Sequence, residues 1–115
     1  FYEGGAAAIF PDLCEDYLAP IPVLERSRMI EAYCRRLSDP DPAVHVPAAK
    51  AWTRWEAATL TLRPDPDLVS TMTDEVAATA FARIENHFFM HGGWFSEEQL
   101  IRGASALRNI PGVIV

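Results

Sequence analysis

The chain has 115 residues, half of them hydrophobic, and its 16 Asp and Glu outnumber its 10 Lys and Arg to give a net charge of −6. This length suits one domain with its own core, and the acidic balance argues against a nucleic-acid surface, which needs clustered positive charge. No apolar run approaches the roughly 18 residues of a membrane span, so neither a nucleic acid nor a membrane is expected as a partner.

Proline and glycine predict a mainly α-helical fold with about five helices. Eight of the nine prolines lie in the first 66 residues, and no glycine occurs between Gly5 and Gly92. So long a stretch without glycine favours helices over a turn-rich β fold. The first helix is predicted at about 12–18, before Pro20, and the second at about 23–37, where apolar residues recur with helical spacing.

Two longer helices are predicted in the middle of the chain. Asp41 is a plausible N-cap with Pro42 at the first helical position, and Pro47 predicts a kink or a restart near Val46. Helix is expected from 48 to about 62, ended by the proline-rich residues 63–66. The next helix is predicted at about 74–90, with Thr73 as its N-cap and a Gly-Gly pair as its stop.

The C-terminal part of the chain differs in kind from the rest. Residues 96–99 match a capping box and predict a last helix through about Leu107. Residues 110–115 end in a β-branched run that suits a buried strand. A single strand has no partner in a helical chain, and the chain does not begin with Met. We therefore expect a helical insert at 1–109, cut where the chain re-enters a sheet at 110–115.

Glu85 is the carboxylate with the least ordinary surroundings. On a helix, the residues three and four positions away share its face, and for Glu85 all four are apolar: Phe81, Ala82, Phe88 and Phe89. A carboxylate there needs a cation, a donor network or a raised pKa. One interpretation is a salt bridge with Arg83, Arg54 or another internal base. The other is a functional site in which Glu56 and Glu85 converge from two helices.

Motifs for other chemistry are incomplete. His87 and His91 have a zinc-compatible spacing, but residue 88 is Phe where an HExxH motif requires Glu. Residues 103–107 lack the second glycine of a nucleophile elbow. Cys14 and Cys34 are too few and too far apart for a metal site or a disulfide scaffold, and we expect reduced thiols in a cytoplasmic protein. Neither a metal nor a cofactor is predicted, and no catalytic residue is identified.

Several blocks in order along the chain nevertheless resemble one family. They are Phe10-Pro11-Asp12, Trp52-x-x-Trp55-Glu56, Ala82-Arg83-Ile84-Glu85-Asn86-His87 and Ile110-Pro111-Gly112-Val113-Ile114-Val115. With them, the sequence closely resembles the prolyl aminopeptidases (proline iminopeptidases), serine exopeptidases of the α/β-hydrolase fold. The resemblance covers essentially the whole chain and implies the helical cap (lid) domain at 1–109, followed at 110–115 by the start of a core strand.

The resemblance also implies roles for individual residues. Glu56 and Glu85 would receive the protonated imino nitrogen of a peptide substrate with an N-terminal proline, and Phe1 would line the pyrrolidine pocket. The catalytic triad would lie in the missing α/β-hydrolase core, so this chain alone should be inactive. Two alternatives stay open: the cap of a related α/β hydrolase acting on another amide or ester, and a free-standing helical interaction module.

Overall fold

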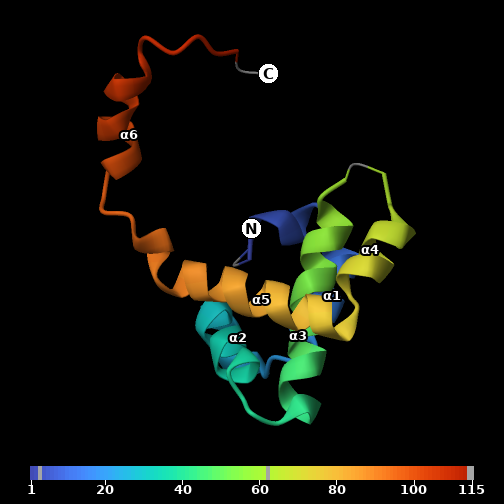
Figure 1. The fold of residues 1–115 in the computed structure, drawn as a ribbon. Helices are drawn as coiled ribbons and strands as arrows, with labels where there is room; N and C mark the ends of the chain where they lie inside the picture. The colour runs from blue at the N-terminus through green and yellow to red at the C-terminus, as the bar shows by residue number, and fades with distance from the viewer. Residues whose placement is uncertain (3, 62, 114–115) are drawn as a thin grey trace.

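The computed structural model describes residues 1–2, 4–61 and 63–113, and within them the predicted mainly α-helical fold is confirmed. These residues form helices and no strand, and none of the helices is both long and apolar enough to cross a membrane. In chain order (Figure 1) the elements are η1 (Gly5–Ala8), α1 (Pro11–Leu18), η2 (Val23–Arg28), α2 (Met29–Leu37), α3 (Pro42–Thr59), α4 (Pro66–Met72), α5 (Glu75–Met90), η3 (Gly92–Trp94), α6 (Gln99–Gly103) and η4 (Ala104–Leu107).

Helix α3 is the centre of the packing, because it contacts α1, α2, α4 and α5 (Figure 1). It carries Trp52 and Trp55, two of the largest fully buried side chains. Fully buried alanines line both α3 and α5, namely Ala48, Ala49, Ala78 and Ala82. Small side chains let two helices approach closely, which suits the extensive packing of α3 against α5.

The start of α3 follows the sequence signal, whereas the expected restart does not occur. The Asp41 carboxylate accepts a hydrogen bond from the backbone N–H of Ala43 at 2.9 Å, and Pro42 is the first helical residue. Pro47 lies inside one continuous helix, Pro42–Thr59, so of the kink or restart predicted near Val46 the restart is wrong, and the kink stays a prediction. Proline this close to a helix start removes only one backbone hydrogen bond, which the tertiary packing of α3 outweighs.

Helix α4 was not expected from the sequence, although its start carries the same Asp-Pro signal as α3. The Asp65 carboxylate accepts from the backbone N–H of Leu68 at 3.0 Å, and Pro66 is the first helical residue. The N-cap of α5 is Asp74 and not Thr73, because the Asp74 carboxylate accepts from the N–H groups of the second and third helical residues. The predicted helix at 23–37 is divided into the 3-10 helix η2 and the α-helix α2.

Beyond α5 the chain leaves the other helices, and α6 projects away from them (Figure 1). The Gln99 side chain accepts from the backbone N–H of Ser96 at 3.1 Å, which is one half of the predicted capping box, and α6 begins at Gln99 itself. Residues 110–113 form neither helix nor strand, and residues 114 and 115 lie outside the described residues. Strand pairing requires neighbouring strands, so the strand at 110–115 stays a prediction.

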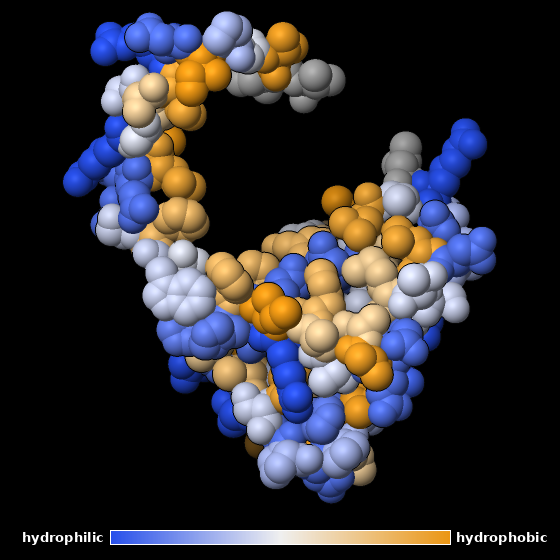
Figure 2. All heavy atoms as spheres, in the orientation of Figure 1, coloured by the Kyte–Doolittle hydropathy of each residue, from blue (hydrophilic) through white to orange (hydrophobic). Residues whose placement is uncertain are grey.

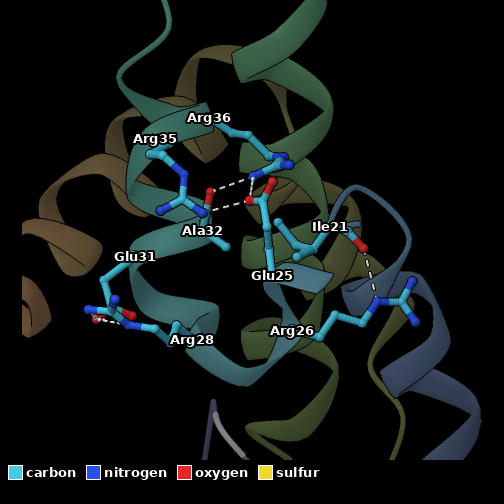
Figure 3. Close-up of polar contacts among 8 residues, drawn as sticks. All are labelled: Ile21, Glu25, Arg26, Arg28, Glu31, Ala32, Arg35 and Arg36. Carbon is cyan, nitrogen blue, oxygen red and sulfur yellow. Dashed lines mark hydrogen bonds and ion pairs between the residues drawn. The ribbon is translucent and has the colours of Figure 1, made fainter. Parts of the chain in front are cut away.

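An ion-pair network joins η2 to the last turn of α2 (Figure 3). One oxygen of Glu25 accepts from Arg35 at 2.6 Å and from Arg36 at 2.8 Å. Arg36 also donates to the backbone carbonyl of Ala32 at 2.8 Å. The hydrogen bonds from the two guanidinium groups lower the pKa of Glu25 from the ordinary 4.5 to about 2.

We predict that Glu25→Gln makes the chain less sensitive to acid. Because the pKa of Glu25 is lower in the folded chain, its contribution to the free energy of unfolding is present above pH 4.5 and is lost as the pH falls toward 2. The loss of thermal stability between these pH values should therefore be shallower in Glu25→Gln than in the wild type. Glu97→Gln, at an exposed carboxylate, is the control, and equal slopes in all three proteins would contradict the prediction.

Candidate functional site

The structure brings Glu56 of α3 and Glu85 of α5 to the same hydroxyl group. The Tyr2 hydroxyl lies 2.6 Å from Oε2 of Glu56 and 2.8 Å from Oε2 of Glu85. The two Oε2 atoms therefore lie no farther apart than the sum of these two distances. A hydroxyl carries one proton, so Tyr2 shares a single donor between two acceptors.

The salt-bridge interpretation of Glu85 is wrong for the described part of the chain. No Lys, Arg or His among these residues pairs with Glu56 or Glu85. Arg83 instead donates to the backbone carbonyl of Leu37 at 2.7 Å, and Arg54 lines a different hollow. Of the three ways to satisfy Glu85, the structure provides a donor network, made by Tyr2 and by the indole Nε1 of Trp52 at 2.7 Å.

Helical spacing explains how α3 supplies one acid, Glu56, and a donor for the other acid on α5. Trp52 and Glu56 are four residues apart, so they share one face of α3. Trp52 is fully buried, and its indole N–H reaches across to Glu85 on the neighbouring helix. On α5, the side chain of Asn86 donates to the backbone carbonyl of Ile30 at 2.9 Å and ties the start of α2 to the same region.

Tyr2 is the site residue that sequence reasoning missed. Its ring stacks on Trp52, with centroids 4.2 Å apart and planes 13° apart, and its side chain is buried. Burial, followed by the hydrogen bonds to the two glutamates, raises the pKa of the Tyr2 hydroxyl far above its ordinary value, so the group stays a neutral donor. A lone Tyr near the N-terminus has no periodic pattern, and its contacts lie 54 and 83 positions away.

The two glutamates lie at an open hollow of about 450 Å³ lined by Phe1, Tyr2, Ile30, Glu56, Glu85 and Phe89. Phe1 is half exposed and packs edge-on against Tyr2, with ring centroids 4.7 Å apart. Aromatic and aliphatic walls beside two acceptors suit a small ligand that has an apolar body and a cationic end.

The histidines and cysteines of the sequence analysis do not join this site. The rings of His87 and His91 lie 4.4 Å apart, and both residues are exposed near the end of α5. Among the described residues, no group of three or more His, Cys, Asp or Glu could hold a metal ion. Cys14 and Cys34 are unpaired, and each is partly buried.

Comparison with known proteins confirms the resemblance found in the sequence. No family model matches the chain. Over its whole length, however, it is 50% identical to the proline iminopeptidase of Xanthomonas citri and 44% identical to that of Arabidopsis thaliana. It is 37% identical to the proline iminopeptidase of Neisseria gonorrhoeae over 97% of its length. The chain spans 37%, 31% and 35% of these three proteins, about a third of each.

We predict that Glu56→Gln stabilises the chain by about 1 kcal/mol, because it removes one of two like charges that share a single donor with no cation beside them. Urea unfolding measures the change. Glu31→Gln is the control, since the Glu31 carboxylate lies on the surface beside Arg28, and surface ion pairs contribute little. A loss of more than about 1 kcal/mol in Glu56→Gln would mean that the carboxylate supports the fold.

Proposed function

We propose that the chain is the substrate-recognition cap of a proline iminopeptidase, an enzyme that releases N-terminal proline from peptides. In this proposal Glu56 and Glu85 bind the protonated imino group, and Phe1 lines the pocket for the pyrrolidine ring. One observation carries the proposal: two carboxylates from separate helices meet at one hydroxyl, beside an aromatic hollow, with no basic partner among the described residues. The similarity to proline iminopeptidases over the whole chain supports it.

The charge of an N-terminal proline complements this arrangement. Its nitrogen is a secondary ammonium with one positive charge and two N–H donors, and hydrogen bonds between charged partners are the strong ones. The cation would also relieve the repulsion between the two glutamates. An acylated nitrogen has neither the charge nor the donors and would leave both carboxylates unpaired, which is costly in a desolvated site. The site would therefore act only on free N-termini.

The apolar lining of the hollow would select the ring. Phe1, Ile30 and Phe89 present hydrocarbon surface next to the two acids. Burying a methylene group is worth about 0.8 kcal/mol. The ring methylenes of proline would therefore add binding energy that an N-terminal residue without the ring does not supply. Charge would then fix the position of the nitrogen, and the aromatic walls would fix the plane of the ring.

The bond-breaking step would belong to the part of the enzyme outside this chain. In the family that the sequence resembles, the α/β-hydrolase core supplies a serine nucleophile with its Asp and His partners, and the cap would position the substrate and shield the acyl-enzyme from water. Residues 110–115 would begin the next core strand. Figure 2 shows apolar side chains along the inner side of the arm that follows α5 (residues 91–113). These side chains would pack against that core. A cytoplasmic location remains a prediction.

In the full-length enzyme, Glu56→Gln and Glu85→Gln should each lower kcat/KM for a prolyl arylamide at least tenfold, about 1.4 kcal/mol of transition-state stabilisation. Each substitution removes one charged acceptor of the ammonium group and keeps the size of the side chain. Steady-state kinetics measure the effect, with Glu31→Gln as a matched surface control that should behave like the wild type.

Unchanged kinetics in both variants would refute the role of the pair. Comparing a prolyl arylamide with its N-acetylprolyl form separates this proposal from a related hydrolase that needs no free amine, because the proposed enzyme should cleave only the free form. A free-standing helical module would cleave neither substrate.

A further inference from the structure

We propose that the Tyr2 hydroxyl determines how many carboxylate oxygens remain open to the substrate, and thereby tunes the site toward a secondary ammonium and away from a primary one. A secondary ammonium carries two N–H groups, and a primary ammonium carries three. Tyr2 acts through Glu56 and Glu85 and is thus a positioning residue. The inference rests on the proposed function of the two glutamates.

The protein donors are distributed unevenly over the four carboxylate oxygens of Glu56 and Glu85. Oε2 of Glu56 accepts from Tyr2, and Oε2 of Glu85 accepts from both Tyr2 and Trp52. No donor from the described residues reaches Oε1 of Glu56 or Oε1 of Glu85. Neither Oε1 is buried, and both glutamates line the hollow, so each Oε1 can accept one of the two N–H groups of an N-terminal proline.

The hydroxyl is held in place before any substrate arrives. The Tyr2 ring is stacked on the fully buried Trp52, and it also contacts Phe89, with ring centroids 5.3 Å apart. The backbone carbonyl of Tyr2 accepts a hydrogen bond from the Tyr17 hydroxyl at 3.2 Å. A donor fixed by the core in this way costs no reorganisation when the substrate binds, which is the condition for a recognition site to be selective.

The site discriminates between secondary and primary ammonium groups through the acceptor that the third N–H of a primary ammonium finds. With Tyr2 in place, both Oε2 atoms already accept from the protein, so a third N–H would have to share a carboxylate oxygen with another donor. A donor that shares its acceptor makes a weaker hydrogen bond than a donor with an oxygen to itself, so a primary ammonium gains less from its third N–H. Tyr2→Phe keeps the ring on Trp52 and removes the hydroxyl, which opens Oε2 of Glu56. Oε2 of Glu85 still accepts from Trp52.

The test compares alanyl and N-methylalanyl arylamides on the full-length enzyme. These substrates share a side chain and differ by one N–H replaced with a methyl group, so they report the number of donors without the pyrrolidine ring. We expect the wild type to prefer the N-methyl substrate in kcat/KM, and Tyr2→Phe to lower that preference about fivefold, the size of one net hydrogen bond. The burial of the methyl group itself is common to both proteins and cancels in the comparison.

Tyr33→Phe is the matched control. Tyr33 is a fully buried tyrosine of the same aromatic cluster, and its hydroxyl donates to the backbone carbonyl of Tyr17 and touches neither glutamate. Its removal should lower the thermal stability and leave the substrate preference as in the wild type. A purely structural role for Tyr2 would give the same result as Tyr33→Phe.

An unchanged preference in a folded Tyr2→Phe enzyme would overturn the inference. If Glu56→Gln and Glu85→Gln still lower kcat/KM in the same experiment, only the role of Tyr2 fails; if they also have no effect, the proposed function fails. Should Tyr2→Phe not fold, the wild type still decides, because equal or better cleavage of the alanyl substrate would overturn the inference.

Discussion

The hydrogen bond from one tyrosine hydroxyl to two carboxylates is the constraint on which the rest of this site depends. It joins the second residue of the chain to α3 and to α5, across 54 and 83 positions of sequence. It also holds two like charges close together, and no basic residue in the described part of the chain pairs with either of them. This arrangement supports the proposal that the site binds a cation.

The site and the hydrophobic core are built from the same side chains. Trp52 fills the centre of the helix packing, carries the ring of Tyr2 and donates its indole N–H to Glu85. The neighbouring Trp55 is equally buried, but its indole nitrogen has no hydrogen-bond partner among the described residues. Of these two tryptophans, only Trp52 both packs the core and donates to an acid, so the geometry of the proposed recognition site depends on the packing of α3 against α5.

The outer parts of the molecule fit the proposal of a cap on a larger enzyme. The chain spans about a third of the proline iminopeptidases that it matches. Large apolar side chains are exposed on the arm that follows α5, among them Leu100, Ile101, Leu107, Ile110 and Val113. Exposed apolar surface of this extent is typical of a face that packs against another part of a protein. The proposed recognition site and the proposed contact with the core would then both belong to this one helical domain.

The sequence by itself determined the features that depend on neighbours along the chain. Helical spacing singled out Glu85, and Asp41 before Pro42 located the start of α3. The same signal at Asp65 and Pro66 starts α4, although the proline-rich pattern there predicts only the end of a helix. Tertiary packing decided the rest: it kept α3 continuous through Pro47, and it brought Tyr2 between the glutamates. Local hydrogen bonds can be inferred from spacing, but a contact between distant segments exists only once the core has fixed how the helices cross.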